Sequence, residues 1–145
     1  KVTAPDPQGA GAEHSMLNAL KDADMGIDQI DYINAHGTST KLNDAAETLA
    51  IRKVFKEPAQ NISINSTKSI IGHLIAASGG PEFVFTALSV NRDELHPTIN
   101  LKNKDPKCDL DYVANVKKQR TVRAAISNSF GVGGQNASIV VKKYI

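Results

Sequence analysis

Apolar residues recur at helical spacing in three stretches of the chain. The first covers about residues 9–24, after a loop over residues 1–8 that contains two prolines. The second covers about residues 44–55, and its first residues, Asp44 and Glu47, have the spacing of a capping box. Apolar and charged positions are segregated in both stretches, so each predicts an amphipathic helix with one buried face.

The third helical stretch covers about residues 73–92 and contains Pro81 near its beginning. Proline lacks a backbone N–H and presses on the preceding turn, so a straight helix is excluded here. We expect either a kink or a helix that restarts with Gly80 near its N-cap and Pro81 at its first position.

Shorter β-prone runs lie between and after these helices. Residues 28–34 and 61–65 each predict a buried strand, and residues 110–113 predict a short extended piece. Residues 122–129 and 137–142 are joined by a glycine-rich turn, which predicts an antiparallel hairpin. A dinucleotide or phosphate loop is excluded there, because a strand and not a helix follows the glycines. The pattern predicts an α/β fold with helices packed on a mixed sheet.

Composition narrows the class of protein further. The 145 residues suit one ordinary domain, with 41% hydrophobic and 22% charged residues and a net charge of only +2. The small basic cluster at residues 117–123 has no interleaved aromatic residues, so nucleic-acid binding is not expected. No apolar run reaches membrane-spanning length, and a single cysteine cannot form an internal disulfide. We therefore expect no membrane partner and a reducing compartment.

Three motifs carry the residues best suited to chemistry. Residues 34–40 place His36 at the end of a predicted strand, where ligands gather in open α/β sheets. Residues 66–73 contain Lys68 and end in a second imidazole, His73. The third motif, over residues 128–136, is rich in glycine, whose backbone N–H groups approach a substrate closely.

In order and spacing these motifs resemble the C-terminal half of a β-ketoacyl-acyl-carrier-protein synthase, a condensing enzyme of the thiolase superfamily, in particular its type II form in fatty-acid elongation. The similarity extends over nearly the whole chain. It includes four further stretches, residues 9–12, 72–79, 97–101 and 108–112.

The resemblance implies a thiolase-like layered fold in which residues 1–145 form the C-terminal half. The family's nucleophilic cysteine belongs to an N-terminal half that is absent here, so the chain alone is expected to be inactive. The first residue is not Met and looks like the interior of a longer chain. A strand before Lys1, which we expect at the centre of the half-sheet, is missing too, so the fragment is expected to be unstable alone and to expose apolar edges.

The resemblance assigns catalytic roles to His36, His73 and Lys68. A condensing enzyme removes carbon dioxide from a malonyl thioester and must stabilise the enolate oxygen that results. Neutral imidazole N–H groups suit this task, which places His36 and His73 at the polar end of the malonyl pocket. Lys68 is expected to hold His73 in the required tautomer, with Glu82 as the ionic partner of Lys68.

The resemblance also suggests substrate contacts. Thr38 and Thr40 match hydroxyls that bind the phosphopantetheine arm of a carrier protein, although Thr40 also has the position of a helix cap. Three residues of the glycine-rich turn match the oxyanion hole and the gate beside the nucleophile: Phe130, Gly131 and Val132. The family usually has Phe at the last position, so Val132 predicts altered gating or acyl-chain preference. Asn128, at the start of this motif, is expected to support the turn.

The remaining candidates are expected to be structural. Cys108 lies in a polar loop with no histidine nearby in the sequence, and the family carries a non-catalytic cysteine there. His14 and His96 are expected to be surface or structural residues. A metal site from His36, His73 and a carboxylate matches no short ligand motif.

The expected partners follow from the resemblance. They are an acyl carrier protein, the missing N-terminal half and, when complete, a second subunit in a homodimer. No cofactor is expected beyond the carrier's phosphopantetheine, and the expected location is the bacterial cytoplasm or an organelle stroma or matrix. Two alternatives stay open: a non-catalytic thiolase-fold module that binds a carrier protein or an active subunit, and a thiolase-like or polyketide-synthase condensing domain with another acyl substrate.

Overall fold

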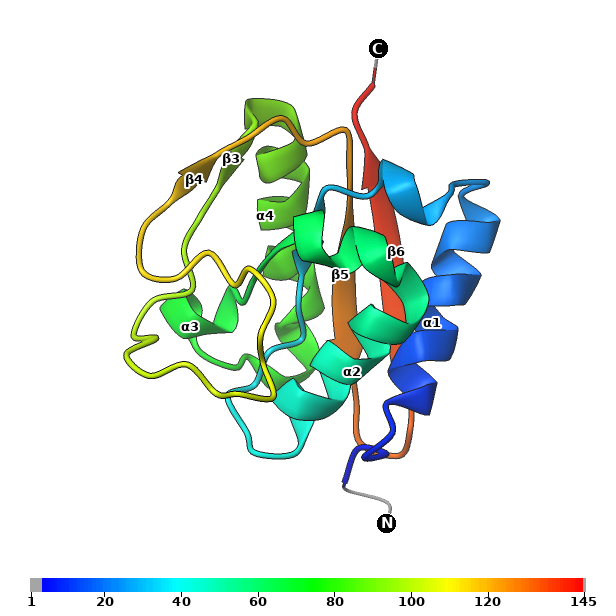
Figure 1. Ribbon diagram of the computed structural model, residues 1–145, viewed down its shortest axis with the longest axis vertical. Helices are drawn as coiled ribbons and strands as arrows, with labels where there is room; N and C mark the ends of the chain where they lie inside the picture. The colour runs from blue at the N-terminus through cyan, green and yellow to red at the C-terminus, as the bar shows by residue number, and fades with distance from the viewer. Residues whose placement is uncertain (1–3, 145) are drawn as a thin grey trace.

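The computed structural model describes residues 4–144, which fold into helices on both faces of a mixed sheet (Figure 1). The sheet has the order β2-β1-β5-β6. Its parallel part consists of β2 (Ser63–Asn65), β1 (Tyr32–Asn34) and β5 (Ala124–Phe130). The last strand, β6 (Asn136–Lys142), runs antiparallel to β5. The predicted α/β class and the terminal hairpin are confirmed.

The strands pair in register, so that their alternating side chains build two apolar layers. Ile33 of β1 lies opposite both Ile64 and Ile126, and all three are buried in the larger core. The preceding residues, Tyr32 and Ala125, point to the other face and join a second core. Successive side chains of a strand point to opposite faces of the sheet, so both sets are buried when helices cover both faces.

Three longer helices supply these covers. Helices α1 (Ala10–Asp22) and α2 (Asn43–Phe55) contribute to the larger core, and α4 (Gly79–Arg92) packs on the other face (Figure 1). The remaining elements are short and are η1 (Ile27–Gln29), η2 (Glu57–Asn61), α3 (Lys68–Ile71), η3 (Ile75–Ala77), and the paired strands β3 (Glu94–Leu95) and β4 (Lys118–Gln119). The structure describes no helix that has both the length and the apolar character needed to cross a membrane.

The proline in the third helical stretch marks a restart, as predicted. Helix α4 begins at Gly79 with Ser78 as its N-cap, so Pro81 lies inside the first turn, where a missing N–H costs no helical hydrogen bond. The cap therefore lies two residues before the predicted Gly80. The residues before it form α3 and η3 instead of a continuous helix.

Several local predictions were wrong. No capping box opens α2, whose N-cap is Leu42 and has no side-chain cap. The extended piece at residues 110–113 forms only an isolated bridge between Ser63 and Asp111, and the small β3–β4 pair was not predicted. The loop predicted for residues 1–8 is present from Ala4 onward, and residues 1–3 lie outside the described part.

The strand expected before Lys1 lies outside this chain, so its central position in the half-sheet stays a prediction. Strand β1 pairs directly with β2 on one side and β5 on the other, and β5 pairs directly with β6. The four described strands therefore form one continuous sheet. Its open edge is the outer side of β6, whereas the outer side of β2 is bridged by Asp111, whose carbonyl accepts the Ile64 N–H at 2.7 Å.

Candidate functional site

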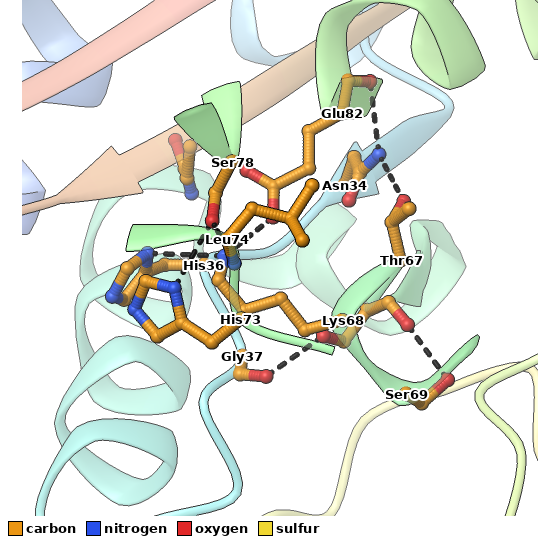
Figure 2. Close-up of polar contacts among 12 residues, drawn as sticks. Asn34, His36, Gly37, Thr67, Lys68, Ser69, His73, Leu74, Ser78 and Glu82 are labelled. Atoms are coloured by element: carbon orange, nitrogen blue, oxygen red, sulfur yellow. Dashed lines mark hydrogen bonds and ion pairs between the residues drawn. The ribbon is translucent and has the colours of Figure 1, made fainter. Parts of the chain in front are cut away.

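The three sequence motifs meet at one edge of the sheet. Strands β1, β2 and β5 are parallel, so their carboxyl ends lie together. His36 follows the end of β1, Lys68 follows β2, and Phe130 is the last residue of β5. His73 lies beside His36 after α3 (Figure 2). The prediction that these side chains share one site is met by this geometry.

His36 is enclosed by its neighbours and only 8% exposed. Its ring centroid lies 5.7 Å from that of His73, with an interplanar angle of 86°, and 5.6 Å from that of Phe130. Burial, and secondarily the charges of Lys68 and His73, lower the pKa of His36 to about 4. The imidazole is therefore neutral at physiological pH.

The tautomer of His36 follows from its contact with Lys68. The Nζ atom of Lys68 lies 3.3 Å from Nδ1 of His36. An ammonium group has donors only, so Nδ1 accepts and the ring proton of neutral His36 resides on Nε2. We had expected Lys68 to orient His73, and this expectation was wrong.

Backbone and hydroxyl groups orient His73 instead. The Ile75 N–H donates to Nδ1 of His73 at 3.0 Å, and the Ser78 hydroxyl lies 3.0 Å from the same atom. Ser78 accepts the Leu74 N–H at 2.9 Å, which leaves its own hydrogen free for His73. Neutral His73 therefore also carries its proton on Nε2. Both imidazoles present the same N–H donor.

The predicted ion pair of Lys68 with Glu82 is present. Nζ lies 2.5 Å from Oε1 of Glu82, and the two side chains are 5% and 1% exposed. Burial raises the pKa of Glu82, and the hydrogen bond from Lys68 opposes this effect. The pair joins α3 to α4, and its Lys68 member contacts His36 (Figure 2). Its removal from water makes the loss of either partner costly.

Glu47 is a site residue that we had read as part of a helix cap. One carboxylate oxygen accepts the His36 N–H at 2.9 Å and the other accepts the Gly37 N–H at 3.0 Å. The side chain is 4% exposed, and burial raises its pKa. Glu47 therefore fixes the turn that carries His36. The spacing from Asp44 gave no signal of this role.

Asn128 supports this arrangement from β5. It is fully buried, and its Nδ2 donates to Glu47 at 3.3 Å, while its Oδ1 accepts the Ser138 hydroxyl at 2.7 Å. Its contacts thus connect β5 and β6 to the carboxylate that holds the His36 turn. The side chain stabilises this connection and does not face the pocket lining.

A cavity of about 890 Å³ opens beside the histidines. Lys68, His73, Thr38 and Thr40 contribute to its wall. The hydroxyls of Thr38 and Thr40 lie 3.0 Å apart, and Thr40 also accepts the N–H of Asn43, the first residue of α2, at 3.3 Å. Thr40 therefore lies on the cavity wall and also assists the start of the helix.

The glycine-rich turn lies at the border of the site. Phe130 contacts the His36 ring, but Val132 is 69% exposed and its side chain is directed to solvent. The Gly131 N–H is already bonded to the carbonyl of Gln135 at 2.7 Å. The gate and oxyanion roles of Phe130, Gly131 and Val132 stay predictions, because the group they would serve is not in this chain.

Cys108 lies on the cavity wall and has no histidine among its polar contacts. Its thiol lies 3.6 Å from the hydroxyl of Thr48, which also contacts Tyr112 at 2.6 Å. Burial raises the pKa of the thiol, so the nucleophilic thiolate is disfavoured. Over residues 4–144, no three His, Cys, Asp or Glu side chains are grouped closely enough to hold a metal ion.

The sheet order, the helical layers and the polar cluster at the carboxyl edge define a thiolase-like protein. The sequence profile of the β-ketoacyl synthase C-terminal domain matches residues 1–102. The chain belongs to the β-ketoacyl synthase family. It is 49% identical to 3-oxoacyl-acyl-carrier-protein synthase 2 of Synechocystis sp. over 99% of the chain and 34% of that relative. The synthase 2 of Staphylococcus aureus is 44% identical over the same shares.

Solved structures give the same result. A ketosynthase in complex with its type II polyketide acyl-carrier protein and bound to the hexaketide superposes with a TM-score of 0.97 at 38% identity, over 99% of this chain and 35% of that one. A β-ketoacyl synthase from Burkholderia phymatum superposes with a TM-score of 0.92 at 34% identity, over 100% and 35%. The chain thus spans about a third of the length of these relatives.

Proposed function

We propose that the protein carrying this chain is a 3-oxoacyl-acyl-carrier-protein synthase. It condenses an acyl thioester with a malonyl group on a carrier protein, with loss of carbon dioxide. The observation that carries this proposal is the edge-to-face pair of His36 and His73, whose rings lie 5.7 Å apart and both bear the proton on Nε2.

Two such N–H donors suit the decarboxylation step. When the malonyl carboxylate leaves, its electron pair becomes an enolate, and negative charge develops on the thioester oxygen. Two neutral imidazoles that both donate an N–H to that oxygen stabilise it without transferring a proton. The Lys68 ammonium, in contact with His36 and held by Glu82, adds positive charge to this side of the site.

The substrate is expected to enter through the cavity beside the histidines. The cavity has a volume of about 890 Å³, and the paired hydroxyls of Thr38 and Thr40 on its wall offer hydrogen bonds to the amides of phosphopantetheine. The backbone of Phe130–Val132 faces the acylated nucleophile that the remainder of the protein supplies. Residues 1–145 form the C-terminal part of that protein, about a third of the length of its relatives, and this part is expected to be inactive alone.

Fatty-acid elongation is the reaction best supported. The identity to fatty-acid-type synthase 2 proteins reaches 49%, compared with 38% for the polyketide ketosynthase complex. The acyl carrier protein is the partner that this reaction requires, and the complete protein is expected to be a homodimer in the bacterial cytoplasm or in an organelle stroma or matrix. A non-catalytic carrier-binding module is disfavoured by the intact cluster of His36, His73, Lys68 and Glu82.

Malonyl-carrier decarboxylation by the complete gene product tests the proposal. Replacing either imidazole, by His36→Ala or His73→Ala, is expected to slow decarboxylation roughly 100- to 1000-fold, the usual effect of removing one oxyanion donor. The exposed His14→Ala is the matched control and leaves the rate unchanged. If both site variants decarboxylate at the wild-type rate, the two imidazoles are not the oxyanion donors, and if the unmodified protein does not decarboxylate malonyl-carrier, the binding-module alternative holds.

A further inference from the structure

A strap of residues 96–99 lies along the turn that carries Lys68, and its residues Thr98 and Ile99 also contribute to the cavity wall. The carbonyl of His96 accepts the Asn65 side-chain amide at 2.7 Å, and the Thr98 hydroxyl accepts the Ser66 N–H at 3.1 Å. The Ile99 N–H donates to the Ser69 hydroxyl at 3.0 Å. The strap therefore braces both ends of this turn.

The His96 side chain adds a further contact to this brace. Its Nε2 lies 3.0 Å from the hydroxyl of Thr67, and its Nδ1 lies 3.1 Å from the carbonyl of Pro97. The ring packs edge-to-face on Phe85 of α4, with centroids 5.4 Å apart. Burial lowers the pKa of His96, which favours the neutral ring. No step of the proposed reaction uses this imidazole.

The direction of every hydrogen bond around Thr67 is fixed. Asn34 donates from Nδ2 to the backbone carbonyl of Glu82 at 3.1 Å and to the Thr67 hydroxyl at 2.8 Å (Figure 2). A carbonyl only accepts, so the amide of Asn34 cannot be reversed. The Thr67 oxygen therefore accepts from Asn34, and its own hydrogen is available to His96.

The same logic applies at the other end of the chain of contacts. The carbonyl of Pro97 can only accept a hydrogen bond, so Nδ1 of His96 carries the proton and Nε2 is unprotonated. Nε2 is thus the acceptor for the Thr67 hydroxyl. Thr67 is fully buried and is the N-cap of α3, and its backbone carbonyl accepts the N–H groups of Ile70 and Ile71. Lys68 is the next residue along the chain.

We propose that His96 is a positioning residue, whose bare Nε2 accepts the Thr67 hydroxyl and thereby fixes the first turn of α3 and the ammonium of Lys68. The inference rests on the proposed function, because Lys68 matters through its contact with His36. His96 itself touches no reacting atom. A buried hydroxyl that loses its acceptor must turn or draw in water, and either change displaces the residue that follows it.

Two substitutions separate the acceptor from the bulk of the ring. In the complete protein, His96→Leu removes the acceptor, whereas His96→Gln retains an amide oxygen near the position of Nε2. His96→Leu is expected to lower kcat for malonyl-carrier decarboxylation about tenfold, the order of one buried hydrogen bond. Its rate of nucleophile acylation is expected to stay within about twofold, because Lys68 contacts His36 and the nucleophile lies outside this chain. His96→Gln is expected to recover most of the loss, and the exposed His14→Leu is the control.

Nitrogen NMR of the unmodified protein gives a readout independent of activity. With histidine labelled with nitrogen-15, His96 is expected to show a protonated Nδ1 and a bare Nε2, assigned by loss of its signals in His96→Gln. This result decides the hydrogen-bond direction even if His96→Leu fails to fold. If the unmodified protein does not decarboxylate malonyl-carrier, the proposed function fails, and the tautomer alone then decides the assignment of His96.

Three results overturn the inference. They are wild-type decarboxylation by folded His96→Leu, an equal loss in His96→Gln and His96→Leu, and an Nε2-protonated ring in the NMR spectrum. The first shows that the strap does not position Lys68. The second shows that ring packing on Phe85 matters in place of the acceptor.

Discussion

Two imidazoles reach the same protonation pattern by different means. The tautomer of His36 is fixed by the Lys68 ammonium, and the tautomer of His73 is fixed by the Ser78 hydroxyl and the Ile75 N–H. The resemblance to a known family selected His36, His73, Lys68 and Glu82, and the fold brings these residues together, while their catalytic roles stay predictions. The resemblance was not sufficient to assign which histidine Lys68 contacts, since that contact depends on how α3 is placed against β1.

The lowered pKa of His36 leads to a prediction about acid stability. Burial lowers the pKa of His36 from 6.5 to about 4. Between these two pH values His36 is protonated in the unfolded chain and neutral in the folded chain. The contribution of neutral His36 to the free energy of unfolding is fully present above pH 6.5 and is lost as the pH falls toward 4. NMR titration of the labelled ring in the complete protein is expected to show neutral His36 at pH 5.

Urea unfolding checks the same effect on the free energy of unfolding. Between pH 6.5 and 4, His36→Gln is expected to lose less stability than the unmodified protein, because it lacks the titrating ring. Equal slopes for the two proteins would show that His36 is protonated normally in the folded state.

At the level of elements, α2 shows that the residue spacing of a capping box can also place a carboxylate against a distant turn. Asp44 and Glu47 have the spacing of a capping box, but Glu47 bonds the backbone of His36 and Gly37 across 11 and 10 residues. The helices themselves were predictable to within a few residues from their apolar period. The role of Glu47 was not, because a local pattern carries no information about which loop folds back on the helix.

Gly37 is the tightest point of this folded-back turn. It has a φ of +44°, and a Cβ atom there would lie 2.6 Å from Cβ of Ser66. Gly37→Ala is therefore expected to destabilise the complete protein by roughly 2 kcal/mol or more and to slow decarboxylation by displacing His36. Gly80→Ala is the matched control, because its Cβ meets open space in the first turn of α4.

Chemical denaturation of both variants gives the comparison. Gly80→Ala is expected to leave the free energy of unfolding unchanged or to raise it by up to about 1 kcal/mol, since alanine favours the helix. Equal stability of the two variants would mean that the turn relaxes without cost and does not constrain His36.

On the scale of the whole molecule, one surface is incompletely covered. Several large apolar side chains of η3 and α4 are exposed, among them Ile75 at 76%, Val84 at 53% and Phe83 at 42%. The outer side of β6 is an open strand edge in the described sheet. The order of the strands was not predictable, because parallel neighbours are joined through helices and sequence distance does not reveal adjacency. Exposure of this kind is typical of an interaction surface.

The isolated chain of 145 residues is expected to self-associate at micromolar concentration. Sedimentation velocity is expected to show oligomers that decrease in Val84→Lys and Leu88→Lys, which charge the exposed face of α4. Leu17→Lys is the control, because its 42% exposed side chain lies on α1, over the opposite face of the sheet. A monodisperse monomer would show that the apolar face of α4 is tolerated in water.

The shared carboxyl edge of β1, β2 and β5 divides the loops of the molecule into two kinds. Loops that leave these strands hold the imidazoles, whereas loops that enter them lie at the far end of the sheet. The exposed segment around Asp24 belongs to the second kind. An inserted tag, a fluorescent label or a longer loop is therefore accommodated there without moving His36 or His73, so this end of the fold is free to vary while the chemistry is conserved.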